Sequence, residues 1–143
     1  KISNEEYFEA EMKRHNIPSK EEKSSLLNRE TGLAYCMQDE EVYREILTLF
    51  KENCKVKMGE LEGAYALPDY AKYRLYSHGL KTTALTVGAV VLSEYAKKME
   101  YAAKRIVEGV EKEEAMHYIR YNHNAFIQSY IDTVEEVSSY LNK

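Results

Sequence analysis

Apolar residues recur every three or four positions through four long stretches of this chain, and only short breaks separate the stretches. This spacing places the apolar side chains of each stretch on one face of an α-helix. The four stripes are Val42, Ile46, Phe50, Cys54, Met58, Leu61 and Tyr65; Tyr73, Tyr76, Leu80, Ala84 and Val87; Leu92, Tyr95, Met99, Ala102 and Ile106; and Ala115, Ile119, Asn122, Phe126, Tyr130, Thr133, Val137 and Tyr140. Since each helix must bury its apolar face, the sequence predicts an all-α fold, an antiparallel four-helix bundle.

The breaks between the stretches carry residues that begin and end helices. Asp39 is a candidate N-cap for the first stretch, and Leu67-Pro68-Asp69 ends that stretch and offers a start for the second. Gly88 with Ala89 allows a bend or close packing, and Gly109 is a candidate left-handed cap. Such short connections predict that consecutive helices are antiparallel neighbours.

Composition excludes several other classes of protein. Only 6 glycines and 2 prolines occur in 143 residues, which is too few for a disordered or all-β chain. The net charge of -4 and the lack of a basic run argue against a nucleic acid partner. The longest stretch of apolar or small residues, 84–92, is far shorter than the roughly 20 residues that span a bilayer. Cys36 and Cys54 follow no metal-ligand spacing, so we expect no metal site and a reduced, cytoplasmic setting.

Residues 1–27 differ from the rest of the chain and are predicted to be an N-terminal helical extension or linker. Ser3 and Glu6 form a capping-box pattern, which predicts a short helix to about His15. Pro18 and the charged residues after it then interrupt that helix. Residues 28–143 are predicted to form the bundle domain, and a start at Lys1 favours a piece of a longer protein.

His78 is the histidine whose surroundings differ most from an ordinary helix face. Helical geometry places it opposite the apolar stripe, where its side chain should project into solvent. On the same face lie two cations, a hydroxyl and an apolar residue that we expect to be exposed: Arg74, Lys81, Thr82 and Leu85. A neutral imidazole is nucleophilic near pH 7, and a neighbouring ammonium can neutralise phosphate oxygens, so this pattern suits a histidine that carries a phosphoryl group. An ordinary solvated face with one stray leucine is the alternative. For His117 and His123, helix packing or capping is favoured over metal binding.

The run from Tyr76 to Ala89, YSHGLKTTALTVGA, resembles the signature of the histidine phosphotransfer (HPt) domain. That signature is His-x-Leu-Lys, followed by small residues and then Gly-Ala. The similarity extends to residues 32–36 and 39–47, which resemble the first bundle helix of the family, to 92–100, which resemble its third, and to Asn122-His123 in its last. The resemblance covers about residues 28–141.

The resemblance implies a phosphorelay carrier in two-component signal transduction. By position, His78 is implied to be the phosphorylated residue, Lys81 to stabilise the phosphate, and Gly88 to let helices pack closely. The implied partner-binding residues are Arg74, Gly79, Thr82 and Leu85, although many members have glycine where this chain has Thr82. The implied partners are the receiver domains of response regulators, with a hybrid sensor histidine kinase as a further one. The receiver would supply Mg²⁺, so no cofactor of the chain's own is expected.

Two other hypotheses about function remain open. One is a non-catalytic helical interaction module that uses the same face. The other is the phosphoacceptor domain of a histidine kinase, phosphorylated by an ATP-binding domain elsewhere in a larger, membrane-bound sensor protein. No Gly-rich phosphate-binding loop occurs, so autonomous kinase activity is not expected.

Overall fold

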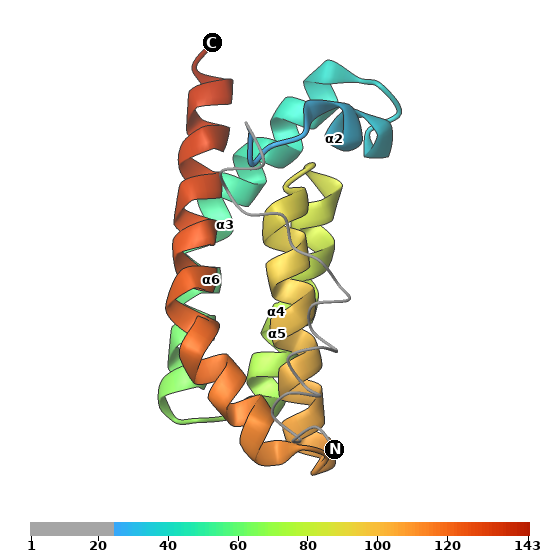
Figure 1. Ribbon diagram of the computed structural model, residues 1–143. Coiled ribbons are helices and arrows are strands. Elements are labelled where there is room, and N and C mark those ends of the chain that lie inside the picture. The colour runs from blue at the N-terminus through green and yellow to red at the C-terminus, as the bar shows by residue number, and fades with distance from the viewer. Residues whose placement is uncertain (1–24) are drawn as a thin grey trace.

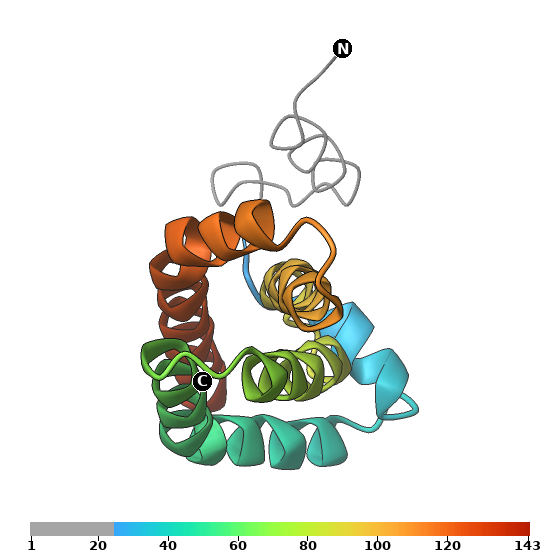
Figure 2. The ribbon, with the colours of Figure 1, turned by 90° about the horizontal axis from the view of Figure 1, so that it is seen from below.

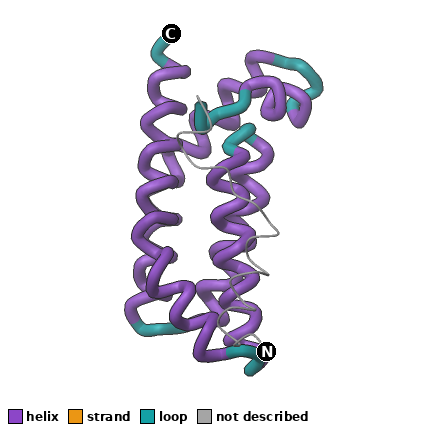
Figure 3. The backbone as a smooth tube through the Cα atoms, in the orientation of Figure 1, coloured by secondary structure: helices purple, strands orange, loops and turns teal. Residues whose placement is uncertain are grey.

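The computed structural model describes residues 25–143, and all regular structure in that range is helical (Figures 1 and 3). Figure 1 labels the helices. Their bounds are α2 Arg29–Tyr35, α3 Glu40–Ala66, α4 Tyr70–Thr86, α5 Val90–Glu108 and α6 Lys112–Leu141. The helix predicted to end at about His15 lies outside the described residues.

Helices α3 to α6 form the antiparallel four-helix bundle that the sequence predicts. Each helix packs against its neighbour in the chain, and α6 closes the ring by packing against α3 (Figure 2). Short turns join the long helices, so each runs opposite to the one before it. The short helix α2 packs against α3 and α4 at the end of the bundle where α4 meets α5 (Figure 1).

The predicted helix ends at Asp39, Asp69 and Gly109 are confirmed. The Asp39 carboxylate accepts hydrogen bonds from the backbone N–H groups of Glu41 and Val42, and Asp69 caps α4 in the same way. Gly109 ends α5 with a φ of 74°, in the left-handed region that glycine enters at little cost. These groups satisfy backbone donors and acceptors that a helix end leaves open.

The buried stripe of α3 differs from the prediction in its first two turns. Val42 is 39% exposed and Ile46 is half-buried, whereas Tyr43 and Leu47 are completely buried. The reason is α2, which the periodicity of α3 alone does not take into account. Tyr43 packs against Gly32 of α2 so closely that a Cβ on this glycine would overlap the Tyr43 ring. The Tyr43 hydroxyl also donates to the carbonyl of Val87, 2.9 Å away.

Gly88 brings the turn between α4 and α5 into direct contact with the start of α2. Its φ of 86° lies in the left-handed region, and a Cβ there would overlap the carbonyl oxygen of Asn28. The Asn28 N–H donates to the Gly88 carbonyl over 2.7 Å. Leu26 and Leu27, placed by the sequence in the extension, are buried against the bundle.

Candidate functional site

His78 lies in the middle of α4, and its imidazole projects from the bundle surface. Its side chain is 58% exposed, as its position opposite the apolar stripe that contains Leu80 and Ala84 predicts. Lys81 follows one helical turn later on the same surface and is partly exposed.

Glu100 of α5 joins these two residues. One carboxylate oxygen, Oε2, lies 2.7 Å from Nδ1 of His78, and the other, Oε1, lies 2.7 Å from Nζ of Lys81. The Glu100 side chain is only 17% exposed, because α4 and α5 pack closely along this part of the bundle. One carboxylate therefore holds both the imidazole and the ammonium of the predicted site.

The charge of Glu100 fixes the proton on His78. Burial raises the pKa of Glu100, but hydrogen bonds from Lys81 and His78 lower it more, so its pKa lies below the ordinary value. An ionised carboxylate only accepts hydrogen bonds, so Nδ1 of His78 must carry the proton that lies between them. In the neutral ring the lone pair is then on Nε2. No other described residue forms a hydrogen bond with Nε2.

Two hydroxyl groups fix the backbone beneath the cluster. Ser93 of α5 donates to the carbonyl oxygen of Lys81 over 2.8 Å, which ties the two helices together at this level. Thr82 donates to the carbonyl oxygen of His78 over 3.3 Å, within α4. The histidine is therefore carried by a helix that is anchored to its neighbour.

The residues predicted to contact a partner around His78 differ in their exposure to solvent. Gly79 and Thr82 are exposed, and Arg74 is half-buried. The prediction of an exposed Leu85 is wrong, since Leu85 is half-buried near the end of α4 against which α2 packs. The exposed leucine of this helix is Leu75, which is 65% exposed and precedes His78 by one turn.

The sequence analysis assigned no role to Glu100, although the sequence contains a pattern that places Glu100 beside His78. In an antiparallel pair of helices, residues equally distant from the turn lie at the same level. His78 is ten residues before Gly88, so its neighbours on α5 are expected about ten residues after it. Glu100 is the acidic residue in that part of α5. The helical wheel of α4 contains no information about this contact.

His123 is 1% exposed and packs in the bundle, as its predicted packing role requires. Its ring stacks on Tyr65 with a centroid distance of 3.9 Å, Nδ1 lies 2.8 Å from the Tyr73 hydroxyl, and Nε2 lies 2.6 Å from Glu62. Burial lowers the pKa of His123 more than Glu62 raises it, so the ring is held neutral. The network joins α3, α4 and α6, and the Tyr73 hydroxyl has no access to a substrate because Tyr73 is completely buried. His117 is exposed and stacks on Tyr121.

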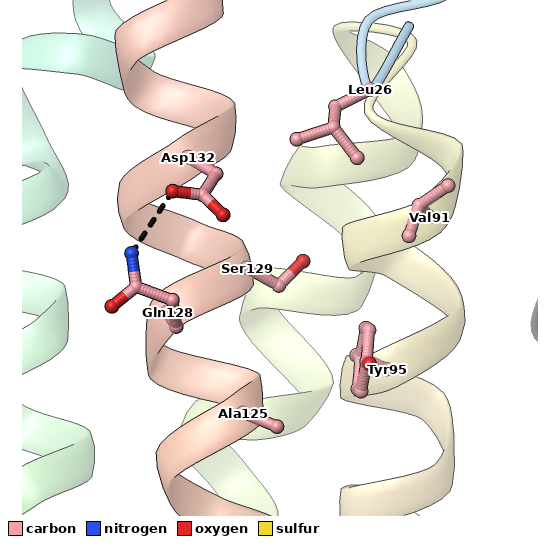
Figure 4. Close-up of a pocket in the computed structure, with 7 residues that line it drawn as sticks. All are labelled: Leu26, Val91, Tyr95, Ala125, Gln128, Ser129 and Asp132. Carbon is pink, nitrogen blue, oxygen red and sulfur yellow. Dashed lines mark hydrogen bonds between the residues drawn. The ribbon is translucent and has the colours of Figure 1, made fainter. Parts of the chain in front are cut away.

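A separate cavity lies between α5 and α6, away from the His78 cluster. Figure 4 shows the residues that line its volume of about 170 Å³, with the Ser129 hydroxyl directed into the space between the two helices. Within residues 25–143, no group of three or more His, Cys, Asp or Glu residues is arranged to hold a metal ion. None of the helices described is both long and apolar enough to cross a lipid bilayer.

Comparison with protein-family models finds no match, and searches of curated proteins and of solved structures find none either.

Proposed function

We propose that this protein is a phosphorelay carrier that receives a phosphoryl group on Nε2 of His78 from an aspartate of a receiver domain and passes it to another receiver domain. The observation that carries the proposal is the pair of contacts made by Glu100. This carboxylate binds the proton on Nδ1 of His78 and so leaves the Nε2 lone pair facing solvent. A nucleophile held in one tautomer by a charged neighbour is the arrangement that covalent group transfer requires.

The transfer balances in atoms and charge. The Nε2 lone pair attacks the phosphorus of the aspartyl phosphate in line, the N–P bond forms, and the P–O bond to the aspartate breaks. The aspartate leaves as a carboxylate, and no proton has to move because Nε2 carries none. The imidazole becomes a cation that keeps its Nδ1 proton, and the anionic Glu100 stabilises it across 2.7 Å.

Lys81 supplies positive charge to the transferred group. Its ammonium has three N–H donors, and the contact with Glu100 occupies one of them. The remaining donors can bind phosphoryl oxygens as charge moves onto them. Pairing with Glu100 also keeps the ammonium at the site before a partner arrives.

The partner docks on the exposed surface of α4 around His78. Gly79 and Thr82 are small, which permits close approach, and Leu75 offers the apolar contact that sequence reasoning assigned to Leu85. Arg74 lies one turn before His78 and adds positive charge to this surface. The receiver supplies the aspartate and its Mg²⁺.

The decisive experiment incubates the full chain with phosphorylated receiver domains and Mg²⁺ and follows acid-labile, base-stable label on this protein. His78→Gln removes the nucleophile, and His117→Gln is the matched control because it removes an exposed histidine from another helix. We expect label on the wild type and on His117→Gln, and none on His78→Gln.

A folded wild-type chain that takes no label from any receiver would refute the carrier proposal. Label from an ATP-binding kinase domain alone would then identify a kinase phosphoacceptor. Binding of receivers without label would identify an interaction module.

A further inference from the structure

The cavity between α5 and α6 contains a buried polar group that no described residue satisfies. The hydroxyl of Ser129 is directed into the space between the two helices (Figure 4), and Ser129 is only 9% exposed. Within residues 25–143, its oxygen forms no hydrogen bond. A buried hydroxyl without a partner costs free energy, so the cavity favours an occupant with a polar atom.

The rest of the cavity has the size and lining of a site for one aromatic ring. Its volume is about 170 Å³, and a cavity of roughly 150 Å³ holds a benzene ring. Its apolar lining consists of Leu26, Val91, Tyr95 and Ala125. Two polar residues also line it, but the Gln128 amide donates to Asp132 over 2.9 Å. The occupant that fits best is therefore a phenol, whose ring suits the apolar lining and whose hydroxyl can bind Ser129.

The described part of the chain begins at this cavity. Leu26 lines it, and the hydroxyl of the preceding residue, Ser25, lies 3.0 Å from a carboxylate oxygen of Glu136 on α6. Residues 1–24 are therefore attached to the bundle at the cavity. The nine residues between His15 and Ser25 can span up to roughly 30 Å when extended, so a helix that ends near His15 can reach the cavity.

We propose that the α5–α6 cavity is the docking site of the chain's own N-terminal segment, with the ring of Tyr7 inside it and the Tyr7 hydroxyl bonded to Ser129. Tyr7 and Phe8 are the two aromatic residues in 1–24, and Tyr7 is the one that carries a polar atom. In a helix, Phe8 points about 100° away from Tyr7. The docking site lies away from the His78 cluster and does not depend on phosphoryl transfer.

The first test places a nitroxide spin label on the full chain at Ala10→Cys and measures the broadening of backbone amide NMR signals. Cys36 and Cys54 are buried and do not compete for the label. We expect residues 91–98 and 125–132 to lose at least half of their signal intensity, and residues 44–55 of α3, beyond α4 from α5 (Figure 2), to lose little. A mixture of the spin-labelled chain with an isotope-labelled chain that carries no nitroxide should show no broadening.

Substitutions in the segment and in the cavity test the two sides of the contact. Tyr7→Ala should abolish the localised broadening, whereas Phe8→Ala, the matched loss of the neighbouring ring, should change it less than twofold. Ala125→Arg should abolish the broadening by filling the cavity. Asn124→Arg is its control, because Asn124 is also exposed on α6 but does not line the cavity. Circular dichroism should be unchanged in all four variants.

A double-mutant cycle tests the hydrogen bond itself. Tyr7→Phe and Ser129→Ala should each weaken the docking equilibrium about fivefold, and Tyr7→Phe should cause no further loss in the Ser129→Ala background. Independent effects of these two substitutions, equal effects of Tyr7→Ala and Phe8→Ala, or broadening spread over the whole bundle would overturn the proposal. Broadening in the mixture would also overturn it and assign the cavity to the segment of a second copy.

Discussion

Replacement of Gly88 by alanine should destabilise the protein far more than the same replacement at Gly109. Both glycines have positive φ, 86° and 74°, so alanine meets the same backbone penalty of about 1–2 kcal/mol at each position. Loss of freedom in the unfolded chain returns about 0.4–1 kcal/mol in both cases. For Gly109, where a Cβ meets no atom within 4 Å, the net loss should therefore be about 0–1.6 kcal/mol.

The surroundings of Gly88 add a second cost. A Cβ there overlaps the carbonyl of Asn28, which is backbone and cannot rotate away. The turn must move, and the 2.7 Å hydrogen bond from Asn28 to Gly88 is strained or lost. Overpacking of about 1–3 kcal/mol and a hydrogen bond of about 1 kcal/mol bring the expected loss to about 2–5.5 kcal/mol. For a chain of this length, that lowers the Tm by about 6–16 °C.

Urea denaturation followed by circular dichroism at neutral pH measures both variants against the wild type. Equal losses for the two substitutions would refute the reasoning, because they would mean that the contact between Gly88 and Asn28 costs alanine nothing. A fully folded Gly88→Ala variant with wild-type stability would refute it completely.

Three further predictions concern the site and the buried network. Glu100→Gln should slow phosphoryl transfer to His78 about tenfold with unchanged circular dichroism, because a charged hydrogen bond becomes a neutral one. Transfer at the wild-type rate would contradict the role of Glu100 in orienting His78. The pKa of His123 is lower in the folded state than in the unfolded chain, so its contribution to stability is present above about pH 6.5 and is lost as the pH falls through the folded pKa. Urea titrations between pH 7.5 and 5 should show this fall in the free energy of unfolding, and His123→Gln should remove the pH dependence. Gly79→Ala should raise the free energy of unfolding by about 0.5–1 kcal/mol, because Gly79 is helical and has open space around it. The same substitution should slow phosphoryl transfer from receivers, and a faster transfer would argue against close approach at this position.

The sequence predicts the helices well because their signals are local. The cap at Asp39, the stop at Pro68 and the left-handed end at Gly109 depend on residues within one turn. The exposure of His78 follows in the same way from the period of α4 alone.

Features that depend on a second helix are the ones that sequence reasoning missed. The apolar period of α3 places Val42 in the core, but it carries no information about α2, which packs against Tyr43 instead. Leu85 is half-buried near the end of α4 against which α2 packs. The contact between Glu100 and His78 follows from the register of α4 against α5, which the turn at Gly88 sets and which neither helix's own period contains.

The position of the charged cluster along the chain has a consequence for how the site assembles. His78 and Glu100 are only 22 residues apart, on two helices joined by one short turn, whereas 61 residues separate the His123 ring from Glu62. Closing the short loop costs less chain entropy, so the α4–α5 hairpin can form its cluster before α3 and α6 find each other. The imidazole of His78 would thus be oriented early in folding, and damage to the α3–α6 contact would loosen the bundle while leaving the His78 cluster in place.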